Sequence, residues 1–351
     1  MTGVKCTDNR RRGRRRRLSK RERRRRALIR LMRRILVILF LIVIALIAFK
    51  FFGKGAHKAA DFEEKTYNKA YHKEELFASS LCVLNLTDNK ELSGLSTLKA
   101  YGLFNVNNHE VPYTFQIHDK IYPASTTKIL TALVALDYAS LDDIVEISKN
   151  ACSTSFAWDE QTCGIKEGDK LTLEALLYGL LLYSGNDTAV AIAEHVGGDI
   201  ETFADMMNQK ARSLLATNSN FMNPSGLYDD DHYTTAYDLY LIFNECIKHE
   251  EFIKIISAES YTAEITKSDG SIEKLKWEPT NYYALGSAKC PENVTIVGGK
   301  TGTLKVAGNC LILMAKDASD NPYISIVMGA DSKDYLYQDM TKLLSEITKN
   351  E

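Results

Sequence analysis

The sequence lacks the close cysteine and histidine spacings that usually form a zinc site. Neither Cys-x-x-Cys nor His-Glu-x-x-His occurs, although the chain has seven residues of each type. Zinc ligands commonly come in such pairs, so we expect no metal and no other cofactor. The chain also contains no internal repeat, which argues against a repeat architecture.

Acidic residues are nearly absent from the beginning of the chain. The 351 residues carry a net charge of −1, but residues 1–34 hold 17 of the 44 Lys and Arg and two of the 45 Asp and Glu. The rest of the chain therefore has a net charge of −16. Such a basic tail can bind nucleic acid or anionic lipid. We interpret it as a topology signal and expect no nucleic-acid partner; DNA binding remains a distant alternative.

An apolar segment follows the basic tail. Ile35–Phe49 is an unbroken apolar run that extends to residue 53, and ~17–25 such residues span a bilayer. The preceding arginines favour a cytoplasmic N-terminus, and no small-residue cleavage site ends the run. We therefore expect a single-pass cell-membrane protein, with a cytoplasmic tail (1–34), a transmembrane signal anchor (35–53), a stalk (54–77) and an extracytoplasmic domain (78–351).

Six of the seven cysteines lie beyond the expected anchor, where disulfides are permitted. Cys152 and Cys163 bracket a short loop and are the pair that we predict to be bonded, the alternative being two buried thiols. Cys82 and Cys310 lie in apolar, strand-like runs and are expected to be buried thiols.

The pattern of apolar residues predicts an α+β fold, a mostly antiparallel sheet flanked by helices. Residues 87–110 show little periodicity and are interpreted as a loop insertion. A helical subdomain is expected to be inserted at about 140–290. Strands are expected at 80–86, 111–118, 294–303, 307–315 and 323–330, and helices at 171–183, 187–196, 235–248 and 335–348.

Three short motifs occur in a fixed order. Ser125-Thr126-Thr127-Lys128 opens an apolar run, Ser184-Gly185-Asn186 separates two expected helices, and Lys300-Thr301-Gly302-Thr303 lies in an expected strand. Each motif alone is weak, since Ser-x-x-Lys also occurs at 96–99 and 271–274. Together they supply a nucleophile, two amines and two further polar groups, which an active-serine enzyme needs when it has no catalytic histidine.

Ser125 and Lys128 are three residues apart, so on a helix they share a face. A serine hydroxyl is a weak nucleophile until a base takes its proton. Lys128 can be that base only if burial or a second cation lowers its pKa, and Lys300 is the expected cation. The alternative is a helix-capping serine beside an exposed lysine.

The second and third motifs also have structural alternatives. Ser184 is a candidate proton carrier and Asn186 a candidate partner of Lys128, although the same loop can simply cap two helices. Glycines in a strand suggest the close approach of another backbone, which a bound peptide would provide. Lys300, Thr301 and Thr303 would then hold its terminal carboxylate.

With these motifs in place, the chain resembles the low-molecular-mass D-alanyl-D-alanine carboxypeptidases, a family of penicillin-binding proteins. The resemblance runs from about Leu81 to Glu351 and includes the run NPSGLYDDDHYTTAYDL at 223–239. It implies a β-lactamase/transpeptidase-like fold. It also implies that the chain removes the terminal D-alanine of peptidoglycan stem pentapeptides through an acyl-enzyme, and that β-lactam antibiotics inhibit it covalently.

The resemblance assigns roles to residues of this chain. Ser125 would be the nucleophile and Lys128 the base, assisted by Ser184 and Asn186. The backbone N–H groups of Ser125 and Thr303 would form the oxyanion hole. The third motif would bind the substrate through Lys300, Thr301, Gly302 and Thr303.

The sequence departs from the family in one respect, and other functions remain to be weighed. No arginine follows Arg212, so a carboxylate-binding arginine that some relatives carry late in the chain is missing. A β-lactamase of class A would need a Glu-x-x-Leu-Asn motif, which is absent. A DD-endopeptidase or transpeptidase on the same scaffold is an alternative. A non-catalytic cell-wall-binding or sensor protein is a further alternative, but it would not need all three motifs intact.

Overall fold

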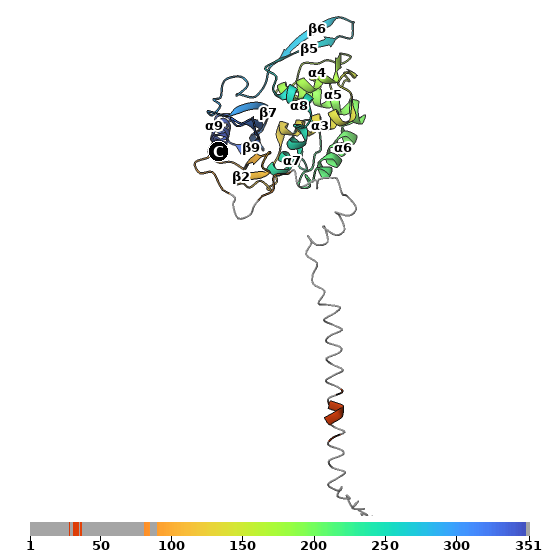
Figure 1. The fold of residues 1–351 in the computed structure, drawn as a ribbon. Helices are drawn as coiled ribbons and strands as arrows, with labels where there is room; N and C mark the ends of the chain where they lie inside the picture. The colour runs from red at the N-terminus through yellow and green to blue at the C-terminus, as the bar shows by residue number, and fades with distance from the viewer. Residues whose placement is uncertain (1–27, 29–30, 35, 37–80, 85–89, 349–351) are drawn as a thin grey trace, which may run out of the picture. The chain divides into compact units, whose positions relative to one another are not determined.

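The computed structural model describes residues 28, 31–34, 36, 81–84 and 90–348 (Figure 1). The chain divides into two compact units, Met1–Glu75 and Leu76–Glu351, and all elements named below belong to the second. Most of the expected tail, anchor and stalk lies outside the described residues. No helix among those described is long and apolar enough to cross a membrane.

The larger sheet has five strands in the order β2-β1-β9-β8-β7, and every pairing is antiparallel. Strands β8 and β9 are buried along almost their whole length, which explains their continuous apolar sequences. Their bounds are β1 Ala100–Asn105, β2 Glu110–Phe115, β7 Thr295–Leu304, β8 Gly308–Lys316 and β9 Pro322–Ala330.

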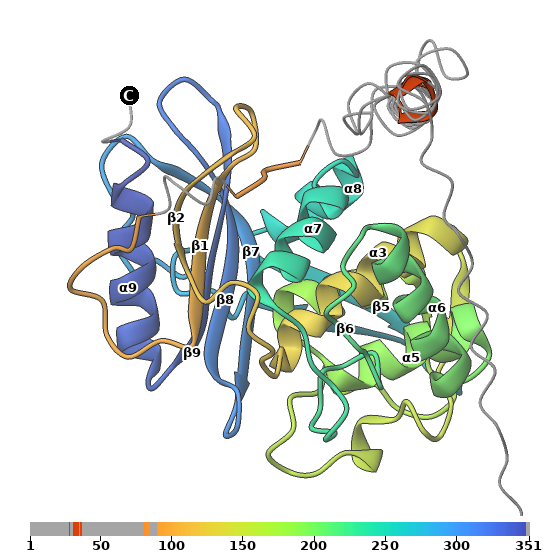
Figure 2. The same cartoon turned by 90° about the horizontal axis from the view of Figure 1, so that it is seen from below.

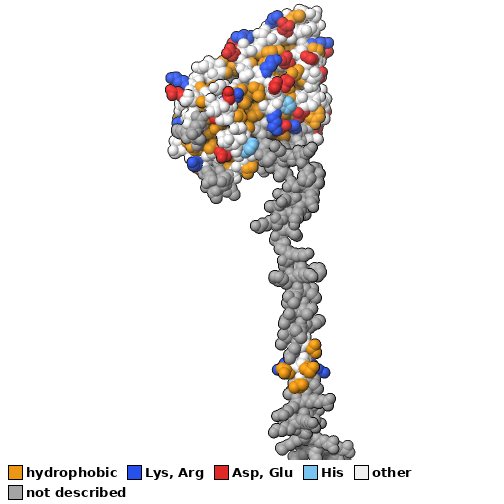
Figure 3. Space-filling view, viewed as in Figure 1, with side chains coloured by type: hydrophobic (Ala, Val, Ile, Leu, Met, Phe, Trp, Pro, Cys, Tyr) orange, Lys and Arg blue, Asp and Glu red, His pale blue; other side chains and the backbone are white. Residues whose placement is uncertain are grey.

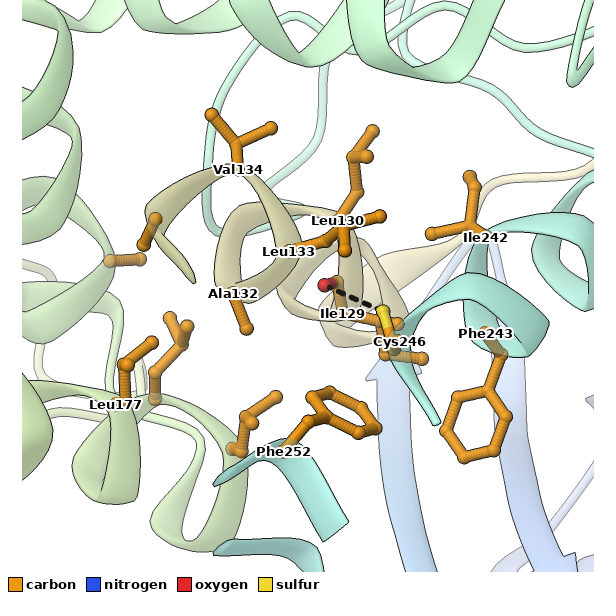
Figure 4. Close-up of a cluster of buried hydrophobic side chains, with 14 of the residues drawn as sticks. Ile129, Leu130, Ala132, Leu133, Val134, Leu177, Ile242, Phe243, Cys246 and Phe252 are labelled. Atoms are coloured by element: carbon orange, nitrogen blue, oxygen red, sulfur yellow. Dashed lines mark hydrogen bonds between the residues drawn. The ribbon is translucent and has the colours of Figure 1, made fainter. Parts of the chain in front are cut away.

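Helices cover both faces of this sheet. Figure 2 shows α9 (Lys333–Ser345) on one side and α3 (Lys128–Tyr138) with α7 (Ala236–Cys246) on the other. Helix α3 is buried on all sides from its first residue to Ala135, as expected of a helix that is apolar all round. Its apolar side chains project in several directions into the core, where Phe252 and Leu177 pack around it (Figure 4).

The region from 140 to 290 contains helices and also a second sheet, which the sequence did not predict. This sheet has the order β3-β4-β5-β6, with β3 and β4 only three residues long, too short to show a periodicity. The strands are Ile144–Glu146, Lys170–Thr172, Tyr261–Thr266 and Ile272–Trp277, and the helices besides α7 are α4 Leu173–Tyr178, α5 Asn186–Gly197, α6 Ile200–Ser213 and α8 Glu250–Ile256.

Two predictions near the start of the domain were wrong. The expected loop insertion at 87–110 contains β1, a central strand between β2 and β9 whose six residues are all buried. Because both faces of β1 are covered, its sequence does not alternate. Of the strand expected at 80–86, residues 81–84 are described and are not in a strand, and residues 80, 85 and 86 lie outside the described residues. The strands expected from 111 onward and the helices expected from 171 onward are present within a few residues of their predicted ends.

The predicted Cys152–Cys163 disulfide is absent, because both residues are free thiols. The Cys152 sulfur lies 3.1 Å from Thr154 Oγ1. The Cys163 sulfur instead packs against Gly185, where an added Cβ would approach it to 2.5 Å. The two sulfurs therefore have different surroundings. Cys82 and Cys310 are buried thiols, as predicted.

Charged side chains of both signs are interspersed on the face of the domain seen in Figure 3. Apolar side chains lie between them. This face therefore lacks the basic stripe by which proteins commonly follow a nucleic-acid backbone.

Candidate active site

The first motif forms a short 3-10 helix, η2 (Ala124–Thr127), which continues directly into α3. Ala124 has a φ of 49°, a left-handed conformation that is costly for a residue with a side chain. The turn places Lys128 Nζ 3.1 Å from Ser125 Oγ. Lys128 is fully buried, so the alternative of an exposed lysine is wrong.

The second motif joins a π-helix, η4 (Gly179–Tyr183), to α5. Ser184 itself takes the left-handed conformation that ends η4, with a φ of 71°. Gly185 has a φ of −61°, which any residue can adopt, so glycine is needed here for lack of space and not for its backbone conformation. An added Cβ there would collide with Cys163 Sγ. Asp187 accepts hydrogen bonds from the backbone N–H of Cys163 at 2.9 Å and thereby ties the neighbouring segment to this loop.

The third motif lies on β7, whose backbone runs against η2. An added Cβ on Gly302 would lie 3.0 Å from the Pro123 carbonyl oxygen and 3.1 Å from Ser125 N. The glycine therefore leaves room for the turn of the same chain that carries Ser125. At Gly298 the close neighbour is the Ile256 carbonyl, again a part of the same chain.

Lys300 links the second and third motifs. Its Nζ donates to Ser184 Oγ at 2.7 Å and to the Thr301 carbonyl at 2.8 Å. Lys128 Nζ in turn donates to Asn186 Oδ1 at 2.7 Å. The five polar side chains singled out for chemistry thus lie in two connected groups, Ser125–Lys128–Asn186 and Ser184–Lys300.

Burial controls the charge of both lysines. It lowers the pKa of Lys128 from 10.5 to about 7, although the Asp187 carboxylate acts in the opposite direction. Burial also lowers the pKa of Lys300 well below its ordinary value, and repulsion from Lys128 adds to this effect. At neutral pH a large share of Lys128 is therefore an uncharged amine.

A neutral Lys128 amine has two hydrogens and one lone pair. Its two shortest contacts, both 2.7 Å, are to oxygens that can only accept, Asn186 Oδ1 and the Ser225 carbonyl. When both hydrogens are donated there, the lone pair is left for the third partner, the Ser125 hydroxyl. The amine is then arranged to take the hydroxyl proton.

A cavity of about 160 Å³ opens over this group. Ser125, Ser184, Thr301, Gly302 and Thr303 lie in its wall, whereas Lys128, Asn186 and Lys300 are not among its lining residues. Thr301 Oγ1 is 2.6 Å from Thr280 Oγ1, and Thr303 Oγ1 donates to Asn309 Oδ1. The remaining wall residues were not predicted from the sequence, since they come from separate segments without a motif: Gln161, Thr280, Lys333, Leu336 and Tyr337.

His232 is a buried residue whose contact with the first motif was also not predicted. The Met222 N–H donates to its Nδ1, so Nε2 carries the hydrogen and donates to Thr127 Oγ1 at 2.9 Å. Burial lowers the pKa of His232 to about 4, so it is neutral at pH 7. Within the described residues, no group of three or more His, Cys, Asp or Glu is placed to hold a metal ion.

The family profile and the similar proteins of known sequence point to the same family. The family profile described as D-alanyl-D-alanine carboxypeptidase, peptidase S11, matches residues 96–332. The D-alanyl-D-alanine carboxypeptidase DacF of Bacillus subtilis is 31% identical over 266 residues, which cover 73% of this chain and 64% of that protein. The D-alanyl-D-alanine endopeptidase of Escherichia coli is 26% identical over 243 residues, covering 69% and 74% of the two chains.

Solved structures agree with this result. The Streptomyces K15 DD-transpeptidase is 29% identical with a TM-score of 0.65, over 71% of this chain and 97% of that one. Penicillin-binding protein 5 from Haemophilus influenzae is 26% identical with a TM-score of 0.65, over 73% and 72% of the two chains. The chain spans 55% to 64% of the length of the curated carboxypeptidases DacF, DacA and DacC that it matches.

Proposed function

Because the chain belongs to the peptidase S11 family of D-alanyl-D-alanine carboxypeptidases, we propose that it is a serine-type D-alanyl-D-alanine carboxypeptidase. Its substrate is the stem pentapeptide of peptidoglycan, from which it removes the terminal D-alanine. One observation carries the proposal: a buried lysine of lowered pKa has its lone pair available to the hydroxyl of Ser125.

The reaction begins when Lys128 takes the proton of Ser125 and Ser125 Oγ attacks the carbonyl carbon between the two D-alanines. The negative charge that develops on the carbonyl oxygen is stabilised by the backbone N–H groups of Ser125 and Thr303. Support for this pairing comes from Gly302, which brings β7 against the backbone of Ser125.

The C–N bond then breaks and the leaving amine needs a proton. Ser184 lies at the cavity wall and accepts a hydrogen bond from Lys300, so its hydroxyl can give a proton to that amine and take one from the Lys300 ammonium. D-Alanine departs and leaves an ester on Ser125. Water then attacks the ester carbonyl and loses a proton through Ser184 to the Lys300 amine, while the Lys128 ammonium returns its proton to Ser125 Oγ. The tetrapeptide leaves and the serine is restored.

The released residue carries the carboxylate of the substrate. This carboxylate lies within one residue of the scissile bond and therefore inside the same cavity as Ser125. The Thr301 hydroxyl can donate to the carboxylate while it accepts from Thr280 Oγ1, and Lys300 lies behind it. The Thr303 hydroxyl donates to Asn309 Oδ1 and has to turn from that partner to bind the carboxylate. Lys333 adds a cation to the cavity wall. It can supply the positive charge for the carboxylate, because no arginine follows Arg212 in the sequence.

The direct test is mass spectrometry of a pentapeptide stem incubated with the protein. Loss of one D-alanine by the native chain, and no loss with Ser125→Ala, is the expected result. An intact pentapeptide after prolonged incubation with folded native protein contradicts the proposal.

A DD-endopeptidase is the second candidate, favoured by the similarity to the Escherichia coli endopeptidase. Cross-linked dimeric stems distinguish it, since an endopeptidase cleaves between the two stems. A β-lactamase would turn over penicillin rapidly, whereas the proposed enzyme retains the acyl group. A non-catalytic wall-binding protein would do neither.

We place the domain outside the cell membrane, held by the apolar segment 35–53 with residues 1–34 in the cytoplasm. The support is the basic tail that precedes an apolar run of membrane-spanning length. Protease added to intact cells should remove the domain and spare the tail. Protection of the domain in intact cells would overturn this orientation.

A further inference from the structure

The catalytic amine has a contact that none of the three motifs supplies. Lys128 Nζ donates to the backbone carbonyl of Ser225 at 2.7 Å, as short as its contact with Asn186. The Ser125 hydroxyl is the longest of the three contacts, at 3.1 Å. If Lys128 is the base of the proposed function, then the Ser225 carbonyl decides where one of its two hydrogens goes.

The direction of that carbonyl is fixed by the turn Asn223–Gly226. Asn223 Oδ1 accepts from Ser225 N at 3.2 Å, from Ser225 Oγ at 3.1 Å and from Gly226 N at 2.8 Å. Asn223 Nδ2 donates to the Leu227 carbonyl at 3.0 Å. One amide side chain therefore holds the turn from inside, in the manner of an Asx turn.

The turn is also held on its outside by the elements that carry the nucleophile and the base. Thr131 Oγ1, one turn along α3 from Lys128, donates to the Pro224 carbonyl at 2.6 Å. Gly226, with a φ of 82°, lies so close to the Ala124 carbonyl that an added Cβ would overlap it. The two residues that flank Ser225 are thus held, Pro224 against α3 and Gly226 against η2.

We propose that Asn223 is a positioning residue for catalysis, which folds the Asn223–Gly226 turn so that the Ser225 carbonyl aims the lone pair of Lys128 at Ser125. Two fixed acceptors, one from α5 and one from this turn, leave the neutral amine a single orientation. With only Asn186 in place, the amine rotates about one hydrogen bond and can donate to Ser125 rather than accept from it.

A positioning role for Asn223 and a mere loosening of the packing around Lys128 predict opposite shifts in the pKa of Lys128. A carbonyl oxygen beside an amine stabilises the ammonium form, so its withdrawal lowers the pKa of Lys128 further. Loosening that admits water to Lys128 has the opposite effect and raises the pKa toward 10.5. The direction of the shift therefore separates positioning from a loss of packing.

The test compares variants of the full-length chain. Asn223→Ala removes the side chain that holds the turn, and Asn223→Asp keeps the accepting oxygen. Asn220→Ala is the matched control, because it loses a hydrogen bond to the Asp231 carbonyl in the same loop without touching the turn. The readouts are the rate of acylation by a fluorescent penicillin against pH, and the titration of Lys128 followed by NMR of ¹³C-labelled lysine.

Asn223→Ala should be acylated at least tenfold more slowly at high pH. The pH at which its acylation rate falls, and the pH at which Lys128 titrates, should both be lower than in the native chain. Asn223→Asp should be acylated at a rate within about threefold of the native rate. Asn220→Ala should be acylated at the native rate. If Asn223→Ala does not melt cooperatively, Asn223→Ser takes its place with the same expected direction.

A native rate in Asn223→Ala, or a Lys128 titration moved to higher pH, overturns the proposal. If the proposed function itself is wrong, the native chain will not be acylated on Ser125. The NMR titration still reports whether the turn controls Lys128 in that case, because it does not depend on activity.

Discussion

At the scale of single residues, the site depends on a lysine without a close counter-ion. No salt bridge involves Lys128 in the described part of the chain, and its three partners are neutral oxygens. Burying an ammonium group in such surroundings is unfavourable, so the group tends to lose its proton. The same burial that removes Lys128 from water therefore favours the uncharged amine, which is the form that can accept a proton.

Acylation should therefore follow the titration of Lys128. With a pKa of about 7, the ammonium form dominates at lower pH and cannot take the proton of Ser125. The rate of penicillin labelling should rise about tenfold per pH unit below pH 7 and level off above it. A profile that rises steadily up to pH 10 would mean that Lys128 keeps an ordinary pKa.

Lys333 provides a second prediction at this scale. Lys333→Ala should reduce kcat/KM about tenfold, or ~1.4 kcal/mol, for a peptide ending in a free carboxylate. It should have little effect on the matching peptide amide. Lys342→Ala, which changes an exposed lysine on the same helix, is the control. Equal losses for acid and amide would show that Lys333 does not meet the carboxylate.

Some of these residues were visible in the sequence and others were not. Ser125 and Lys128 were paired correctly because i and i+3 positions share a helix face in any context. The Ser225 carbonyl has no signature, since every residue has such a group. Lys333 is one exposed lysine among many, and only the fold brings it to the cavity wall. The prediction of a Cys152–Cys163 disulfide was wrong because the spacing of two cysteines in the sequence does not determine where their sulfurs point.

At the scale of elements, contact between η2 and β7 assembles the site. Gly302 permits this contact, since Pro123 and Ser125 lie where its side chain would be. Gly302→Ala should push the strand and the turn apart by a few tenths of an ångström. Acylation should then fall by about ten- to a hundredfold, because reacting groups tolerate little misplacement.

Gly270→Ala is a suitable control for that variant. Gly270 lies between β5 and β6 with a φ of 85° and has open space around it. The substitution strains a turn and lowers the melting temperature without reaching the site. If both variants lose acylation in proportion to their melting temperatures, Gly302 matters only for stability.

The elements themselves were predicted where burial was one-sided or runs were long. Helix α7 and strands β8 and β9 have such patterns and were predicted within a few residues. Strand β1 is buried on both faces and contains Gly102, so it resembled a loop. The glycines of β7 correctly indicated a close backbone, but for Gly298 and Gly302 it is the protein's own chain that approaches rather than a substrate.

At the scale of the whole molecule, the second unit contains everything that the proposed chemistry needs. Its two apolar cores lie on opposite faces of the large sheet, and all three motifs fall within it. Removing residues 1–53 should therefore give a protein that stays in solution and labels with penicillin at the native rate. A folded truncation that no longer labels would show that the N-terminal segment contributes more than location.

The proposed chemistry requires that Ser125 forms the acyl-enzyme with Lys128 as its base. The most direct measurement is mass spectrometry of the intact protein and its peptides after brief exposure to penicillin at pH 8. We predict one penicilloyl group on Ser125 in the native chain and none in Ser125→Ala. Lys128→Ala should acquire it several orders of magnitude more slowly. Stoichiometric labelling of another residue, or native-rate labelling of Lys128→Ala, would show that Ser125 and Lys128 do not have these roles.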